Sequence, residues 1–497
     1  MASLETTAPI LQQAAEGVST ESRLVQAWKP SAIAADVATL GTGTLLAGLF
    51  NVALIFVLPR LITVEDYGYW RIFALYAGYA GFLHFGFADG ALLRWAGNPL
   101  EEFHQEISVA LKYLFWQQVI VLAPLCAIAA LVLPGSLRFV GVALAVYVLV
   151  INLVMLLQFG LQSAKIFRPM AISSVAAPAL FLGFVLLWHS EWHSDYREVT
   201  GFNAAGWLVV LVLLLAWTKP WSGARSAVRL MSLAKACVKS GWPIVLANTG
   251  VLLIVSADRL AVSWAATIRN FAQYSLAASA MAVPITVIQA CSKVFFSHLA
   301  GVTPDGRKRI YALCSRTLLM AWAVMLPYYF ALDFFVRHFL PRYTPSLAYA
   351  RILLLGIPFL ASIQILQMSY AYLNGMQKHF LWRTAAILAL TLGGTSFAAF
   401  HTNSLRTVAA VQVSVLAAWW LLNEWTLRNL TGEMEGSWLK FLSIYGLASA
   451  SYWTATHWAG RDVTAAILVY YVLLIVVLAL LCRGDLRLLR HAAWKTS

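Results

Sequence analysis

The dominant pattern in the chain is a succession of long apolar stretches separated by short polar segments. An α-helix rises about 1.5 Å per residue, so about 20 apolar residues cross a hydrocarbon core of about 30 Å. The pattern predicts fourteen spans, at residues 36–58, 70–93, 113–133, 139–161, 170–188, 203–217, 241–264, 272–297, 313–333, 347–372, 384–400, 407–425, 441–459 and 464–481. We therefore expect an all-α, polytopic membrane protein with about 14 transmembrane helices.

The seventh span carries two adjacent charges in an otherwise apolar sequence. It runs from Trp242 to Trp264 and contains Asp258 followed by Arg259. Charged side chains inside a membrane are costly, usually face a protein interior or a watery cavity, and often mark a transport pathway. Neighbouring helical positions point about 100° apart, so the two side chains do not share one face. Each needs a partner on another helix or a ligand.

Composition agrees with a membrane protein. The 497 residues are 61% hydrophobic and 11% charged, with a mean hydropathy of +0.74, whereas soluble domains carry about 25% charged residues. The net charge of +14 fits basic cytoplasmic loops better than a nucleic-acid partner. The five cysteines stand far apart without a C-x-x-C motif, so we expect helix-packing residues and neither a disulfide framework nor a metal site.

The distribution of Lys and Arg along the chain predicts its orientation in the membrane. They are about twice as frequent in the segments that would share a side with the N-terminus as in the opposite segments, which predicts that both termini are cytoplasmic. Residues 1–30 lack the features of a cleaved signal and are expected to form a cytoplasmic tail.

An internal repeat appears when the chain is shifted by about 205 residues, and it predicts two parallel six-helix lobes. Transporters with such repeats place the substrate between the halves. The predicted domains are an N-terminal lobe at 31–217, a basic cytoplasmic linker at 218–240, a C-terminal lobe at 241–430, an extra helix pair at 431–482 and a cytoplasmic tail at 483–497.

Several short stretches resemble a known family. They are PRLITVEDYGYW after the first span, GFADGALLR at the end of the second, and SADRLAVS followed by FAQYSLA in the seventh and eighth. Over roughly residues 35–430 the chain resembles the Wzx-type oligosaccharide flippases of the multidrug/oligosaccharidyl-lipid/polysaccharide exporter superfamily.

The resemblance implies a bacterial inner-membrane protein that moves an undecaprenyl-diphosphate-linked oligosaccharide to the outer leaflet, for O-antigen (lipopolysaccharide) or exopolysaccharide biosynthesis. A polysaccharide polymerase and a chain-length regulator would be its partners.

A diphosphate head group needs cationic side chains within the membrane. The candidates for binding substrate are Arg259, Lys293, Arg94 and Arg60, and those for ion coupling or a gate are Asp258 and Asp89. No Walker A motif is present, so no nucleotide cofactor is expected, and an H⁺ or Na⁺ gradient or downstream turnover would drive transport. The repeat aligns Arg259 with Leu54, so the charge is not required by the shared architecture. Either Asp258 or another helix neutralises Arg259, or Arg259 lines the cavity between the lobes.

Asp89 lies in a glycine-rich part of the second span. Gly86-x-x-x-Gly90 indicates close helix packing, with a mobile gate as the alternative. The repeat places Lys293 at nearly the depth of Asp89, so a cross-lobe ion pair would close the cytoplasmic side. In the other interpretation Arg94 caps Asp89 and Lys293 extends its amine to the interface.

Three further motifs have simple structural interpretations. His189 and His193 flank Glu191 at a spacing that suits a metal only within a helix, and the two tryptophans of this loop indicate a membrane-interface anchor instead. Glu65-Asp66 fits a short interfacial loop better than a glycosyltransferase site. Glu424 is expected to form a surface pair with Arg428.

Three classes of function remain. A flippase of lipid-linked oligosaccharides is favoured. A cation-coupled exporter of small molecules or drugs is the alternative, although Arg259 and Lys293 would stand where such an exporter needs an acidic or aromatic pocket. A membrane glycosyltransferase or polysaccharide polymerase is disfavoured because the longest outer connection, at 189–202, is short. We therefore expect a transporter and not an enzyme.

Overall fold

The computed structural model describes residues 30–189, 195–220, 230–281, 284–285, 304–374, 376–402, 404–431, 438–458 and 463–481. Over these residues the backbone is helical and contains no strand. Every one of the fourteen predicted apolar segments overlaps a described helix. Ten described helices are long and apolar enough to span a membrane. The predicted all-α, polytopic fold is therefore confirmed.

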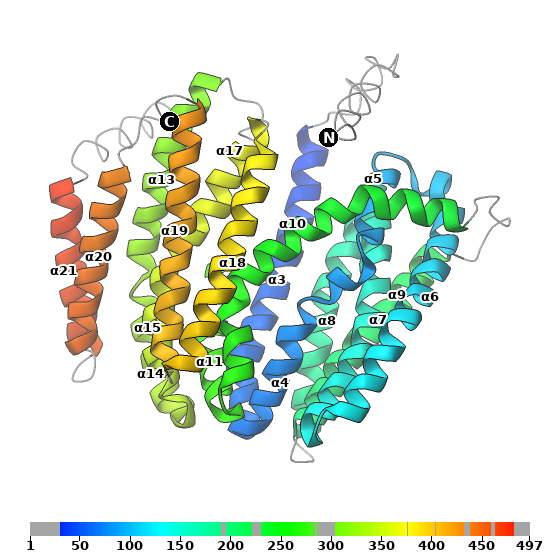
Figure 1. Cartoon of the computed structure of the whole chain (residues 1–497), viewed down its shortest axis with the longest axis horizontal. Coiled ribbons are helices and arrows are strands. Elements are labelled where there is room, and N and C mark those ends of the chain that lie inside the picture. The colour runs from blue at the N-terminus through cyan, green and yellow to red at the C-terminus, as the bar shows by residue number, and fades with distance from the viewer. Residues whose placement is uncertain are drawn as a thin grey trace.

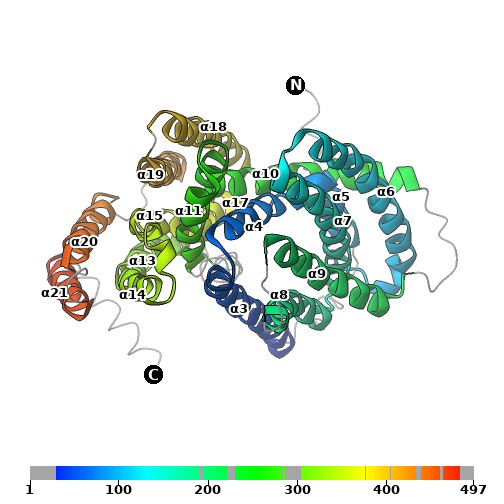
Figure 2. The ribbon, with the colours of Figure 1, turned by 90° about the horizontal axis from the view of Figure 1, so that it is seen from below.

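The first group of helices comes from residues 30–218. Its members are α3 (Pro30–Leu61), α4 (Val64–Ala77), the short 3₁₀ helix η1 (Ala80–His84), α5 (Phe87–Trp95), α6 (Leu100–Val132), α7 (Gly135–Ser163), α8 (Phe167–His189) and α9 (Tyr196–Thr218). These helices lie together on one side of the molecule (Figures 1 and 2).

The second group follows the long helix α10 (Leu230–Ala265). It contains α11 (Ile268–Ala280), α13 (Pro304–Met325), α14 (Tyr328–Phe339), η2 (Pro341–Tyr343), α15 (Ser346–Leu353), η3 (Leu354–Gly356), α16 (Ile357–Ala361), the π-helical turn η4 (Ser362–Gln367), α17 (Met368–Leu373), α18 (Gln377–His401) and α19 (Leu405–Thr431). The remaining pair, α20 (Trp438–Trp458) and α21 (Val463–Leu481), lies at the outer edge of this group (Figure 2).

The two ends of this bundle are called the Pro30 end and the Leu61 end. The Pro30 end, uppermost in Figure 1, is where α3 begins. The Leu61 end is where α3 ends and α4 starts, and where α10 ends and α11 starts. Thr63 and Thr267 cap the helices that start at this end, because Thr63 Oγ1 accepts from Asp66 N at 3.1 Å and Thr267 Oγ1 accepts from Asn270 N at 3.3 Å. A threonine side chain therefore caps the start of both α4 and α11.

Helix α10 joins the two groups. It begins at Leu230, well before residue 241 where the apolar pattern starts, so the second part of the predicted linker continues directly into the span. The first part of α10 packs on α5, while the part after Pro243 packs on α18 and α11. Figure 1 shows α10 crossing the molecule obliquely from one group to the other.

The second predicted span is broken instead of continuous. Helix α4 ends at Ala77, η1 follows, and α5 starts at Phe87. Phe85 and Gly86 form the turn before α5 with positive φ values of 51° and 78°. Backbone polar groups that a helix would satisfy are therefore released inside the bundle, and they need side-chain partners there.

Candidate functional site

The contact between the two groups contains an arginine that is not among the candidate residues predicted from the sequence. Arg71 lies two turns inside α4, and its Nε is buried without a hydrogen-bond partner among the described residues. Tyr67, one turn earlier, and Arg259 of α10 are its charged or titratable neighbours. A buried Nε–H without an acceptor, with a second cation nearby, is costly, so this position indicates an anionic ligand.

Arg259 lies on the face of α10 that borders this contact. Its side chain has no hydrogen-bond or ion-pair partner among the described residues. The adjacent Asp258 carboxylate instead accepts from Tyr274 Oη and from the backbone N of Arg259, both at 2.7 Å. Asp258 is therefore satisfied by α11 and by the backbone, and its side chain forms no direct ion pair with Arg259.

A pocket beside Arg259 is lined by polar side chains of two helices, α10 and α19. Asp258, Arg259 and Gln412 of α19 line it together with apolar side chains such as Leu353 and Met281. Gln412 Nε2 donates to Ile254 O at 2.8 Å, and its buried Oε1 has no partner among the described residues. The pocket leaves about 30 Å³ for the centres of water molecules, which suits one or two waters and no sugar.

Close helix packing lies on both sides of the two arginines. Towards the Leu61 end, a Cβ on Gly68 would lie 2.5 Å from Ile268 Cγ2, so α4 and α11 are in tight contact. Towards the Pro30 end, a Cβ on Gly90 would lie 1.8 Å from Cys237 O, and one on Gly241 would lie 1.9 Å from Gly86 O. This second contact joins α5 to the first part of α10. Tight helix contacts therefore lie on both sides of the region around the arginines.

The glycines of the second span therefore pack as the sequence indicates. Gly86 and Gly90 bring the backbones of α5 and α10 together, as small residues do in membrane helix pairs. The contact of α5 with α10 joins the first helix group to a helix that continues into the second group. Close packing at these glycines is therefore compatible with a gate at the same place.

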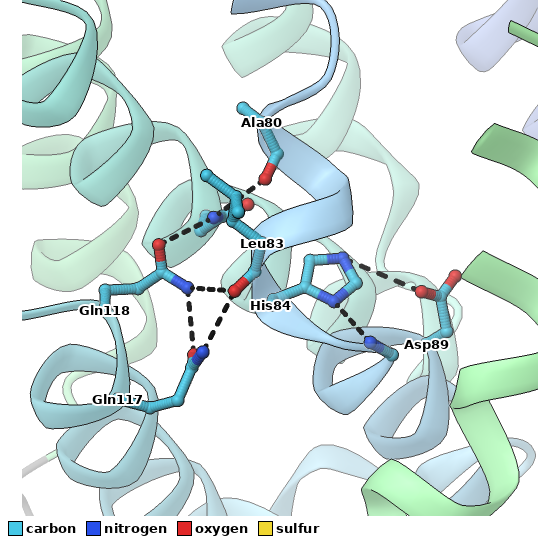
Figure 3. Close-up of polar contacts among 8 residues, drawn as sticks. Ala80, Leu83, His84, Asp89, Gln117 and Gln118 are labelled. Carbon is cyan, nitrogen blue, oxygen red and sulfur yellow. Dashed lines mark hydrogen bonds and ion pairs between the residues drawn. The ribbon is translucent and has the colours of Figure 1, made fainter. Parts of the chain in front are cut away.

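A buried polar cluster surrounds the break between α4 and α5 (Figure 3). Asn152 of α7 donates to Ala80 O at 3.1 Å, and Gln117 and Gln118 of α6 both donate to Leu83 O at 2.9 Å. These side chains satisfy carbonyl groups that the break releases. His84 completes the cluster, with its Nε2 lying 3.6 Å from Asp89 Oδ2.

Asp89 is thus partnered by His84, and the predicted cap by Arg94 is wrong. Arg94 instead binds Glu106 through two contacts of 2.9 Å, because Glu106 of α6 lies beside the end of α5. Arg60 is exposed near the end of α3 and lies over the ring of Phe339 at 5.9 Å. Neither arginine joins the contact of Arg71 with Arg259. Lys293 lies outside the described residues.

Other predictions need correction or fall outside the described ranges. Glu65 and Asp66 belong to the first turn of α4 and not to a loop, and Asp66 pairs with Thr63 at its start. Glu424 is buried and accepts from Tyr311 Oη, so it is not a surface residue; the side chain of Arg428 is not described. The loop at 190–194, which contains Glu191 and His193, also lies outside the described residues.

Comparison with known proteins gives a structural likeness. No protein-family model matches the chain, and no curated protein matches its sequence. The lipid II flippase MurJ in an inward closed conformation matches with a TM-score of 0.68 and 13% identity, over 89% of this chain and 99% of the flippase. A multidrug resistance MATE family transporter of the MOP superfamily in an outward-facing conformation matches with a TM-score of 0.50 and 12% identity, over 80% of this chain and 96% of the transporter.

The chain has the fold of these flippases and transporters. Both matched structures are transport proteins and not enzymes. At 12–13% identity the likeness concerns the fold, and neither the substrate nor the role of a residue follows from it.

Proposed function

We propose that the chain is a flippase for undecaprenyl-diphosphate-linked oligosaccharide repeat units, working by alternating access between its two lobes. The observation that carries the proposal is the unpartnered, buried Nε of Arg71 with Arg259 as a charged neighbour, where α4 packs on α10. Two guanidinium groups from different lobes can bind the oxygens of a diphosphate, each in a planar, two-pronged geometry.

The alternative, a cation-coupled drug exporter, is less well supported by the same residues. An organic cation would meet two positive side chains, and the nearby acidic group, Asp258, already accepts two hydrogen bonds. An anionic head group would instead compensate both arginines. The likeness to a lipid II flippase adds to this preference because that substrate, too, is carried on a lipid.

The closed contacts suggest how transport proceeds. The pocket at Arg259 is too small for a sugar, so the substrate must enter after one of the two glycine contacts has opened. Opening between α5 and α10 would admit the head group from the Pro30 end, and opening between α4 and α11 would release it at the Leu61 end. A conformational change of this kind requires that substrate or ion bind the two states differently.

The proposal also includes the membrane in which the protein resides, its partner proteins and the ion gradient that drives transport. The protein resides in the bacterial inner membrane with the Pro30 end in the cytoplasm, and it supplies repeat units to a polysaccharide polymerase and a chain-length regulator for O-antigen or exopolysaccharide synthesis. Coupling to H⁺ or Na⁺ drives the cycle, with Asp258 as a candidate ion site. Reporter fusions at Thr402 and Ser194 should report the periplasm, and fusions at Gly223 and Asp305 the cytoplasm; a reversed pair would overturn this orientation.

The decisive experiment tests the arginines in a strain that lacks the native gene. Loss of the protein should leave complete lipid-linked repeat units on the cytoplasmic leaflet and no polysaccharide on the surface. Arg259→Ala should accumulate in the membrane at the native level and fail to restore export, whereas Arg259→Lys should restore part of it because the charge remains. Arg60→Ala, on an exposed side chain, is the matched control and should export normally.

Each contrary outcome is informative. Accumulation of incomplete sugars in the deletion strain would identify a transferase and overturn the flippase proposal. Full export by Arg259→Ala at native protein level would remove Arg259 from the substrate path. Normal surface polysaccharide in the deletion strain, together with loss of resistance to an organic cation, would favour the exporter.

A further inference from the structure

We infer that His84 and Asp89 form a proton-binding site that controls the opening of the Pro30 end, a proton at His84 favouring the open conformer. Both residues are buried, with 1% and 8% of their surface exposed. The inference rests on the proposed function only where it equates this opening with the loading of substrate.

The hydrogen bonds of the closed conformer determine the protonation state of the imidazole. The backbone N of Gly86 donates to His84 Nδ1 at 3.1 Å. A backbone N–H can only donate, so Nδ1 carries no proton and the ring is neutral. The single ring proton is then on Nε2, which faces Asp89 Oδ2 at 3.6 Å. Figure 3 shows the ring between these two contacts.

Protonation of His84 would break the hydrogen bond from Gly86 N that holds the turn before α5. A proton on Nδ1 replaces the acceptor for Gly86 N–H with a second donor, so the two N–H groups oppose each other. Gly86 has a φ of 78°, where a side chain is strained, and a Cβ there would lie 2.4 Å from the backbone of Gly241 and Trp242. The same turn places Phe85 against Trp242, with ring centroids 6.2 Å apart. Loss of the Gly86 hydrogen bond therefore acts directly on the surface that binds α10.

Asp89 makes the protonated state attainable inside the bundle. Its carboxylate would pair with the imidazolium, since a charge buried without a partner is costly. The other titratable groups on the surrounding helices include two weak acids, the buried thiol of Cys237 on α10 and the half-buried Tyr113 on α6, which packs on Phe87. The charged groups are already bound or lie on the surface. Arg94 and Glu106 bind each other, Lys112, Lys235 and Lys239 are exposed, and α6 and α7 present neutral amides to the cluster from Gln117, Gln118 and Asn152.

Thermodynamic linkage gives the direction of the effect. The closed conformer requires neutral His84, so the open conformer binds a proton more tightly, and lower pH shifts the equilibrium towards opening. A single linked proton changes the ratio of open to closed protein by at most about tenfold per pH unit. A proton would thus prepare the Pro30 end for a substrate, and its release would permit closure.

Labelling of Cys237 measures this opening without any substrate. Cys237 is 1% exposed in the closed contact, so a maleimide reaches it only when α5 and α10 separate. The experiment uses the full-length protein in proteoliposomes, with Cys126, Cys291, Cys314 and Cys482 replaced by serine. Each rate is divided by the rate of the same protein unfolded in detergent at the same pH, which removes the pH dependence of the thiol itself. The normalised rate should rise severalfold between pH 8 and pH 6.

Two variants make the inference testable at the level of single atoms. In His84→Asn the amide oxygen can still accept from Gly86 N–H but cannot be protonated at these pH values, so labelling should stay slow and independent of pH. In Asp89→Asn the imidazolium loses its counter-ion, so the rise should move to lower pH. A flat profile in the parent protein, or an unchanged rise in His84→Asn, would overturn the inference.

The outcomes separate this inference from the proposed function. The labelling assay contains no lipid-linked sugar, so a flat profile leaves the flippase proposal and its arginine test intact. Conversely, normal export by Arg259→Ala would not affect a pH-dependent opening that depends on His84.

Discussion

Replacing Gly90 by alanine should disfavour the closed contact of α5 with α10. The added Cβ would lie 1.8 Å from Cys237 O, 2.5 Å from its carbonyl carbon and 2.7 Å from its Cα, whereas ordinary contact begins at 3.4 Å. All three atoms belong to the backbone, so no side chain can rotate away. The two helices must separate by about 1.6 Å, the difference between 3.4 and 1.8 Å, which destabilises the closed contact.

The size of the effect follows from the cost of overpacking. Inserting a methyl group into a well-packed contact destabilises it by about 1–3 kcal/mol. Since about 1.4 kcal/mol corresponds to a tenfold change in an equilibrium constant, the ratio of open to closed protein should rise by about 5-fold to 150-fold. The assay is the maleimide labelling of Cys237 in the single-cysteine background, at a pH where the parent protein labels slowly.

Gly183→Ala is the matched control. Gly183 lies in α8, and a Cβ there meets nothing within 4 Å, so labelling of Cys237 should not change. If Gly90→Ala is expressed normally and labels no faster than the parent protein, then the glycine contact does not limit access. Equal acceleration by both variants would instead indicate a general loosening of the bundle.

Three further predictions address the site and the polar cluster. Arg71→Ala should abolish export at normal protein level while Arg71→Lys retains part of it; full export by Arg71→Ala would contradict a role in binding phosphate. Asn152→Ala should lower the free energy of unfolding by about 1–3 kcal/mol, because Ala80 O loses its buried donor, and this is measurable as a lower midpoint of thermal unfolding in detergent. Tyr274→Phe removes one of the two hydrogen bonds to Asp258, whereas Asp258→Asn removes the charge itself. Both should weaken the dependence of export on the ion gradient, and Tyr274→Phe should weaken it less. A larger effect of Tyr274→Phe would assign the ion site to the tyrosine.

The apolar pattern was sufficient to predict the helices because membrane spans differ so strongly from their connections in hydrophobicity. It could not predict the break at residues 78–86, since carbonyl groups released there are satisfied by Gln118 and Asn152 on other helices. Glu424 was misplaced for the same reason. Its partner Tyr311 is distant in sequence, and the neighbouring Arg428 offered a simpler explanation.

Arg71 was missed although a local signal was available. The apolar window began at residue 70, which placed Arg71 at the helix end, but Thr63 followed by Asp66 is an N-terminal capping pattern. Starting the helix at Val64, as the structure does, moves Arg71 about 10 Å into the bundle at about 1.5 Å per residue. That Arg259 is a charged neighbour of Arg71 cannot be predicted from the sequence, because it depends on how the two helix groups pack together.

The broken second span also has a consequence for how the chain enters the membrane. Asn152, which satisfies Ala80 O, follows it by 72 residues, and the two glutamines on α6 follow Leu83 by 34 and 35 residues. During synthesis the released carbonyl groups have no protein donor until those later helices have been inserted. In lipid, a segment without such donors is more stable as an uninterrupted helix. The turn at Phe85 and Gly86, and with it the surface that receives α10, therefore forms only after α7 has left the ribosome and joined the nascent bundle.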